Sequence, residues 1–152
     1  MEKQKIPEGF LIGTSSSAWQ VEGTAGKTEK QKSWAELFYE TNPDLWYDKI
    51  GPEKASDFYH CYPEDIHTMA KFGMNSFRFT IQWARFMKDP IAGIADPAAV
   101  KYYQSVIDEI RRNGMEPVVS LEHWDIPAVL CEKYNGWVSR DTVYLYEMYV
   151  NE

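Results

Sequence analysis

A histidine, a tryptophan and an aspartate stand side by side after an apolar run, and their side chains are well suited to chemistry. The segment consists of Val118–Leu121 followed, after one glutamate, by His123, Trp124 and Asp125, and it closes on Pro127. Such an apolar run is typical of a strand. A strand whose far end carries clustered polar and aromatic groups indicates a site at that end.

Two further polar residues belong to strand-like segments. Gln20 follows the short strand-like stretch 10–18, and its amide can both donate to and accept from hydroxyl groups. An ordinary loop glutamine is the alternative. Arg78 lies in the segment 75–83, where aromatic and aliphatic residues alternate with polar ones. We interpret Arg78 as pointing into a shared interior, where it needs a carboxylate. The alternative, a solvent-facing polar side, is disfavoured by helical patterns on both flanks.

Helical patterns separate these strands. One is predicted at 59–72, with Ser56 as its cap and a separate or kinked first turn at Pro63. Another starts at Asp96 and Pro97 and ends at 113–114, a strand at 116–122 follows, and a third helix spans 141–150. Strands that alternate with helices predict a parallel sheet with right-handed crossovers. The long connection 24–51 is expected to hold a helical turn at 33–38 and to contribute to a pocket rim.

Composition excludes several classes of protein. The net charge of −7 comes without a basic stripe, so nucleic acid is not an expected partner. No apolar run approaches the ~18 residues of a membrane span, and residues 1–9 contain no signal-peptide core. Cys61 and Cys131 have no CxxC partner, which favours reduced, buried thiols and a cytoplasmic protein. His60 and His67 are interpreted as surface or packing residues rather than metal ligands.

Several motifs together resemble the N-terminal part of glycoside hydrolase family 1, the β-glucosidases and 6-phospho-β-glucosidases. They are Phe10–Thr14, Gln20–Gly23, Asn75–Arg85, His123–Pro127 and Gly136–Trp137. The resemblance implies an α/β fold made of the N-terminal βα units of a (β/α)8 TIM barrel, an incomplete barrel. Residues 1–152 would form a single partial domain that holds the first three βα units. The high aromatic content fits either a ring-lined sugar pocket or core packing.

The resemblance also implies roles for individual residues. Gln20 and His123 match residues that hydrogen-bond sugar hydroxyls, and Trp124 matches a neighbouring pocket aromatic. Arg78 matches an arginine beside the nucleophilic carboxylate. Three places depart from the family pattern: Glu122 replaces an aromatic or histidine, Asn135 replaces a turn glycine, and the loop 87–93 differs. Asparagine is tolerable at 135 because it can adopt the left-handed conformation.

No catalytic residue is assigned within the chain. Retaining hydrolysis needs two carboxyl groups roughly 5 Å apart, and in this family they are glutamates from the fourth and seventh strands. Glu152 superficially matches the first of them, but we expect the preceding helix to run back towards the opposite face of the barrel. No cofactor or metal is implied.

The resemblance thus implies the N-terminal fragment of a retaining β-glycosidase for β-glucosides or 6-phospho-β-glucosides in carbohydrate metabolism, and we expect this fragment to be inactive alone. Its exposed strand edges favour instability or self-association. A non-catalytic module, either a sugar-binding remnant or a self-associating half-barrel, is the alternative.

Overall fold

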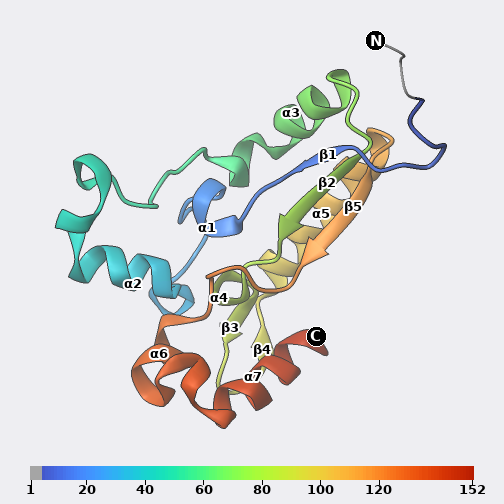
Figure 1. Cartoon of the computed structure of the whole chain (residues 1–152). Helices are drawn as coiled ribbons and strands as arrows, with labels where there is room; N and C mark the ends of the chain where they lie inside the picture. The colour runs from blue at the N-terminus through green and yellow to red at the C-terminus, as the bar shows by residue number, and fades with distance from the viewer. Residues whose placement is uncertain (1–4) are drawn as a thin grey trace.

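Three short parallel strands form the central sheet of the protein. The structure is a computed structural model that describes residues 5–152. The N-terminal residues 1–4 lie outside this range. The strands are β1 (Gly13–Ser15), β2 (Ser76–Thr80) and β5 (Glu116–Ser120), in the order β1-β2-β5 (Figure 1). A Cβ on Gly13 would overlap the carbonyl oxygen of Ser76, so a glycine lets β1 approach β2 closely. The parallel sheet confirms the fold class.

Two long helices make the crossovers between the strands. Helix α3 (Phe58–Lys71) leads into β2, and α5 (Pro97–Arg112) leads into β5. The Asp96 side chain accepts from the backbone N–H of Ala98 at 2.9 Å and caps α5, as its sequence predicts. Helix α3 begins differently from the prediction. Its cap position is Asp57, in the left-handed conformation, rather than Ser56.

Helix α3 also passes through Pro63 as one helix, so the predicted separate first turn is wrong. Proline removes one backbone hydrogen bond, the one to the carbonyl of Tyr59. The apolar side of α3, with Phe58 and Ile66 buried, holds the helix against the sheet and offsets that loss. Tertiary packing therefore keeps the first turn within one helix, and the alternative, a kink at Pro63, stays a prediction.

The remaining elements are short. They are α1 (Ala18–Val21), α2 (Trp34–Thr41), α4 (Trp83–Phe86), β3 (Met87–Asp89), β4 (Ile94–Ala95), α6 (Ala128–Tyr134) and α7 (Arg140–Val150), with 3-10 turns at Glu29–Gln31, Pro43–Leu45, Tyr47–Lys49 and Gly136–Val138. Helices α2 and α7 fall where the sequence predicts helical structure. The antiparallel hairpin β3–β4, α4 and α6 were not predicted, and Trp83 lies in α4 rather than in a strand.

The hydrophobic core covers one face of the sheet and continues past its carboxyl end. Phe77 and Phe79 of β2 are buried there with residues from both long helices, among them Ile66, Val106 and Ile110. Arg78 lies on the opposite face, as predicted, and is half-buried. On the outer strand β5, both Val118 and Val119 remain 40% exposed. Residues 5–152 do not close a barrel, as expected for a partial (β/α)8 fold.

The two cysteines differ in exposure, and two of the histidines are exposed. Cys61 is exposed and Cys131 half-buried, so the prediction of buried thiols is wrong for Cys61; both are free. His60 and His67 lie exposed on α3. Asn135 adopts the left-handed conformation (φ 58°), which confirms that asparagine suits this turn. Within the described residues, no helix combines the length and apolar character needed to cross a bilayer.

Candidate functional site

The loop that follows β5 is held by its own side chains. The Asp125 carboxylate accepts from the backbone N–H of His123 at 3.1 Å, and Glu122 Oε1 accepts from the N–H of Trp124 at 2.9 Å. Trp124 between them has a positive φ of 69°, a strained conformation for a bulky residue. These two acceptors stabilise the turn and so present His123 and Trp124 at the carboxyl end of the strand.

Helix α2 is attached directly to this loop. The N–H of Trp34 donates to the carbonyl of Ile126 at 2.8 Å, and the N–H of Ala128 donates to the carbonyl of Lys32 at 2.8 Å. Ser33 and Glu36 form a capping box that fixes where α2 starts. The attachment places the Trp34 ring 5.9 Å from the Trp124 ring, between centroids. The connection 24–51 thus contributes to the pocket rim, as predicted.

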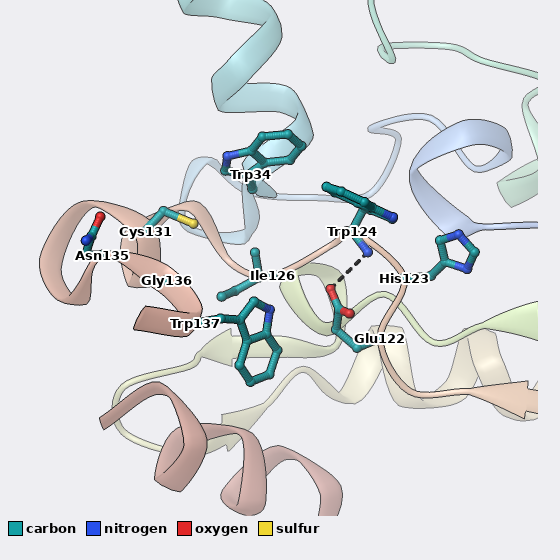
Figure 2. A pocket seen from close by; sticks show the side chains of 9 residues that line it. All are labelled: Trp34, Glu122, His123, Trp124, Ile126, Cys131, Asn135, Gly136 and Trp137. Carbon is teal, nitrogen blue, oxygen red and sulfur yellow. Dashed lines mark hydrogen bonds between the residues drawn. The ribbon is translucent and has the colours of Figure 1, made fainter. Parts of the chain in front are cut away.

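A cavity of about 600 Å³ opens beside the loop. Figure 2 shows the rings of Trp34, Trp124 and Trp137 around it, with Glu122 on one side. The complete lining is Trp34, Glu122, His123, Trp124, Ile126, Cys131, Asn135, Gly136 and Trp137. Ring faces with a few polar groups suit a sugar, whose C–H faces stack on aromatics while its hydroxyls need hydrogen bonds.

The predicted site residues are only partly brought together. His123 and Trp124 line the cavity, whereas Gln20 and Arg78 do not. In Figure 2 the His123 ring turns to the side of the loop away from Cys131 and Asn135. There, Arg78 Nη2 lies 2.9 Å from His123 Nδ1, and Arg78 Nη1 donates to the carbonyl of Ser16 at 3.4 Å. Arg78 therefore links the segment before α1 to the loop after β5.

Gln20 lies on the exposed side of α1. Its side-chain oxygen accepts from Ser17 Oγ at 2.6 Å, which leaves the amide N–H groups without a protein partner among the described residues. Arg78 has no carboxylate partner among the residues that the structure describes, contrary to the expectation for a buried arginine. Its half-exposed position explains why none is required.

A buried ion pair forms at a different arginine, Arg85. Glu22 Oε2 accepts from Arg85 Nε at 2.8 Å, and both side chains are buried. Arg85 also donates to the carbonyls of Gly23 and Ala25 at 2.8 and 2.6 Å, and its guanidinium lies 4.6 Å from the Tyr59 ring centre. Burial raises the pKa of Glu22, and the Arg85 charge opposes that rise.

Tyr103 of α5 completes this buried cluster. Its hydroxyl donates to Glu22 at 3.0 Å and accepts from the backbone N–H of Gln82 at 2.9 Å. The cluster joins the loop after β1, which follows Gln20, to the segment after β2 and to α5. The cluster holds these segments together but contributes no side chain to the lining of the cavity.

Asp125 has an unusual environment for a carboxyl group. It is fully buried, and its Oδ2 has no protein partner. Burial raises its pKa from the usual 3.8 to about 8, with a smaller contribution from the nearby Glu122 charge. Because it is closed to solvent, Asp125 supports the loop and cannot contact a substrate.

Glu152 lies beyond the last turn of α7, where its N–H donates to the carbonyl of Tyr149 at 3.3 Å. The Tyr149 hydroxyl donates to the carbonyl of Ile81, just past the end of β2, at 2.8 Å. This contact places the end of α7 near the carboxyl end of β2, so within the described residues α7 does not reach the opposite face of the sheet. Glu152 follows a helix and not a strand, however, so it does not occupy a position at the end of a strand.

The profile of glycosyl hydrolase family 1 matches residues 2–152. The chain belongs to this family. The 6-phospho-β-glucosidase GmuD of Bacillus subtilis is 42% identical over 148 residues, which are 97% of this chain and 31% of that protein. β-Glucosidase 11 of rice is 35% identical over 98% of this chain and 28% of its own length.

Solved structures of the family superpose closely on the fold. The rice β-glucosidase Os3BGlu6 superposes with a TM-score of 0.87 at 35% identity, over 95% of this chain and 30% of its own. Aphid myrosinase superposes with a TM-score of 0.89 at 29% identity, over 97% of this chain and 32% of its own. The chain thus spans about a third of the length of these relatives and corresponds to their N-terminal portion, with an incomplete barrel.

Proposed function

We propose that this chain forms one wall of the sugar site of a retaining β-glycosidase and supplies no catalytic carboxyl group. Gln20 and His123 would hydrogen-bond sugar hydroxyls, and Trp124 would contact the sugar ring. The observation that carries the proposal is the placement of His123 and Trp124 at the carboxyl end of a parallel strand in a member of this family.

The carboxyl groups near the site support the second half of the proposal. Asp125 is buried, and Glu122 is engaged with the backbone of Trp124. Retaining hydrolysis requires two accessible carboxyl groups roughly 5 Å apart. Residues 5–152 show no such open pair at this strand edge, so the pair is expected from strands that the described residues do not include.

The substrate class is proposed as β-glucosides or 6-phospho-β-glucosides, used in carbohydrate metabolism in the cytoplasm. The 42% identity to GmuD favours the phosphorylated sugar, and the plant β-glucosidases at 35% support the unphosphorylated one. A 6-phosphate adds charge that needs cationic partners. Parallel assays with an aryl β-glucoside and its 6-phosphate distinguish the two.

The 152-residue chain alone is expected to show no turnover of either substrate, because two carboxyl groups are required and the site offers no open pair. The measurement is release of the aryl group by the purified chain. Co-expression with the complementary part of GmuD is expected to generate activity. Robust turnover by the isolated chain would contradict the proposal.

His123→Ala in that complemented enzyme is expected to lower kcat/KM roughly 10–100-fold, the effect of losing one hydrogen bond to a developing transition state. Lys101→Ala is the matched control, because Lys101 is exposed on α5 and distant in the chain from every site residue. An unchanged kcat/KM for His123→Ala would show that the ring does not bind the sugar.

A second candidate function, a self-associating half-barrel, is favoured by the open strand β5. Val118 and Val119 are each 40% exposed on this strand, and Leu121, just after it, is 37% exposed. An uncovered apolar strand edge is a template for pairing with another chain. Light scattering of the purified chain is expected to give a mass above that of one 17.7 kDa chain.

Val119→Lys is expected to shift this distribution towards the monomer, since a lysine on an edge strand opposes pairing. The control is Val143→Lys on the exposed side of α7, which leaves the edge intact. A monomeric wild-type chain, or equal effects of both variants, would exclude pairing through β5.

A further inference from the structure

The contact between Arg78 and His123 indicates which nitrogen of the His123 ring is protonated. Arg78 Nη2 and His123 Nδ1 lie 2.9 Å apart, a hydrogen-bond distance. A guanidinium has only N–H donors and no acceptor, so the imidazole nitrogen that it contacts must present a lone pair. Nδ1 therefore carries no hydrogen, and in a neutral ring the hydrogen resides on Nε2.

The surroundings of Arg78 hold it in this contact. It lies on the central strand β2, paired in register with Ser15 on one side and Val118 on the other. Its second amino group donates to the carbonyl of Ser16 at 3.4 Å. Strand and carbonyl together restrict the guanidinium to the gap between the segment before α1 and the loop after β5.

We propose that Arg78 is a positioning residue that fixes His123 as the neutral Nε2–H tautomer, so that the ring acts as a donor towards a ligand oxygen. Gln20 offers the same chemistry, because its oxygen is occupied by Ser17 and its N–H groups remain. A ligand that contacts the Nε2–H of His123 must therefore supply an acceptor oxygen. The identification of that ligand as a sugar rests on the proposed function; the tautomer does not.

The other two histidines of the chain provide an internal contrast. His60 Nδ1 lies 2.6 Å from a carboxylate oxygen of Asp57, and His67 Nδ1 lies 3.2 Å from Asn113 Oδ1. The Asn113 amide nitrogen donates to Glu109, which fixes the orientation of that side chain. Both rings face acceptors, so their Nδ1 atoms carry hydrogens. His123 is expected to show the opposite pattern.

Long-range ¹H–¹⁵N spectra of the ¹⁵N-histidine-labelled chain test the proposal at about pH 8, where an ordinary imidazole is neutral. A His123→Gln variant assigns the signals by their loss. We expect His123 Nδ1 at the shift of an unprotonated ring nitrogen and Nε2 at that of a protonated one. Protonated Nδ1 in wild-type His123 would overturn the proposal, and this result requires no sugar.

Arg78→Met supplies the second arm. Because the donor is lost, the His123 signals are expected to move to values averaged between the two tautomers, while those of His60 and His67 stay in place. Arg78→Lys, which restores a donor, is expected to return them towards the wild-type values. Unchanged His123 shifts in an Arg78→Met chain with wild-type circular dichroism would overturn the positioning role. Failure of sugar binding alone would count against the proposed function and leave the tautomer assignment standing.

Discussion

Replacing Arg85 with methionine is expected to lower the free energy of unfolding by about 3–5 kcal/mol, because it leaves a buried carboxylate without its cationic partner. Glu22 would keep only the Tyr103 hydroxyl, and the carbonyls of Gly23 and Ala25 would lose their donors. Urea unfolding followed by circular dichroism at neutral pH measures the effect.

The pH dependence of that loss has a defined sign. Burial already raises the pKa of Glu22, and Arg85 opposes the rise, so Arg85→Met raises the pKa further. Below the pKa of the unfolded chain Glu22 is neutral in both states, and the variant carries no buried charge. The deficit relative to wild type is therefore smallest in acid and grows as the pH rises.

Two companion variants separate charge from packing. Glu22→Gln combined with Arg85→Met removes both charges and is expected to be more stable than Arg85→Met alone. Arg112→Met is the matched control: Arg112 is an exposed arginine on α5 paired with Glu109, and its loss is expected to change stability by less than about 1 kcal/mol. A stability of Arg85→Met equal to that of Arg112→Met would show that the buried pair contributes nothing.

The pairing of Glu22 with Arg85 could not be predicted from the sequence. The alternation of β2 indicates correctly that Arg78 lies on the face opposite Phe77 and Phe79. It cannot indicate that the loop after β1 folds over α4 and delivers its glutamate to Arg85. That pairing joins residues 63 positions apart, and it depends on how the two loops pack, which no local periodicity encodes.

Local signals explain which elements were predictable. Helix α5 is bounded by an aspartate cap, a proline at its first position and a glycine after its end, and the structure has it at 97–112. The strands were predicted too long because apolar and polar residues continue to alternate past the last ladder residue, as in 81–83. The hairpin β3–β4 and α6 contain too few residues to show a period.

Some residues of the candidate site could be predicted from the sequence and others could not. A histidine and a tryptophan directly after a strand-like run are visible in the sequence, and they do lie at the end of β5. Trp34 reaches the cavity because the chain at the start of α2, at Lys32 and Trp34, is hydrogen-bonded to the backbone of Ala128 and Ile126. Backbone hydrogen bonds of this kind do not depend on the type of residue. The sequence could therefore suggest that this segment contributes to the pocket rim, but not which of its side chains lines the cavity.

Asp125→Asn is expected to change how stability depends on pH. Burial raises the pKa of Asp125 from 3.8 to about 8. Between these values the unfolded chain releases this proton while the folded chain keeps it. Stability therefore falls as the pH rises through this window, by up to about 1.4 kcal/mol per pH unit, and the fall ends above the folded pKa. Asparagine retains an acceptor for the His123 N–H but carries no titrating proton.

The stability of Asp125→Asn relative to wild type should thus improve by about 1–3 kcal/mol between about pH 5 and about pH 7, measured by urea midpoints in matched buffers. Asp108→Asn, the same substitution on the exposed side of α5, is the matched control. Parallel pH profiles of Asp125→Asn and wild type would mean that the buried carboxyl ionises in the folded chain without penalty. Its unpartnered Oδ2 would then require a partner, such as bound water, to stabilise the charge.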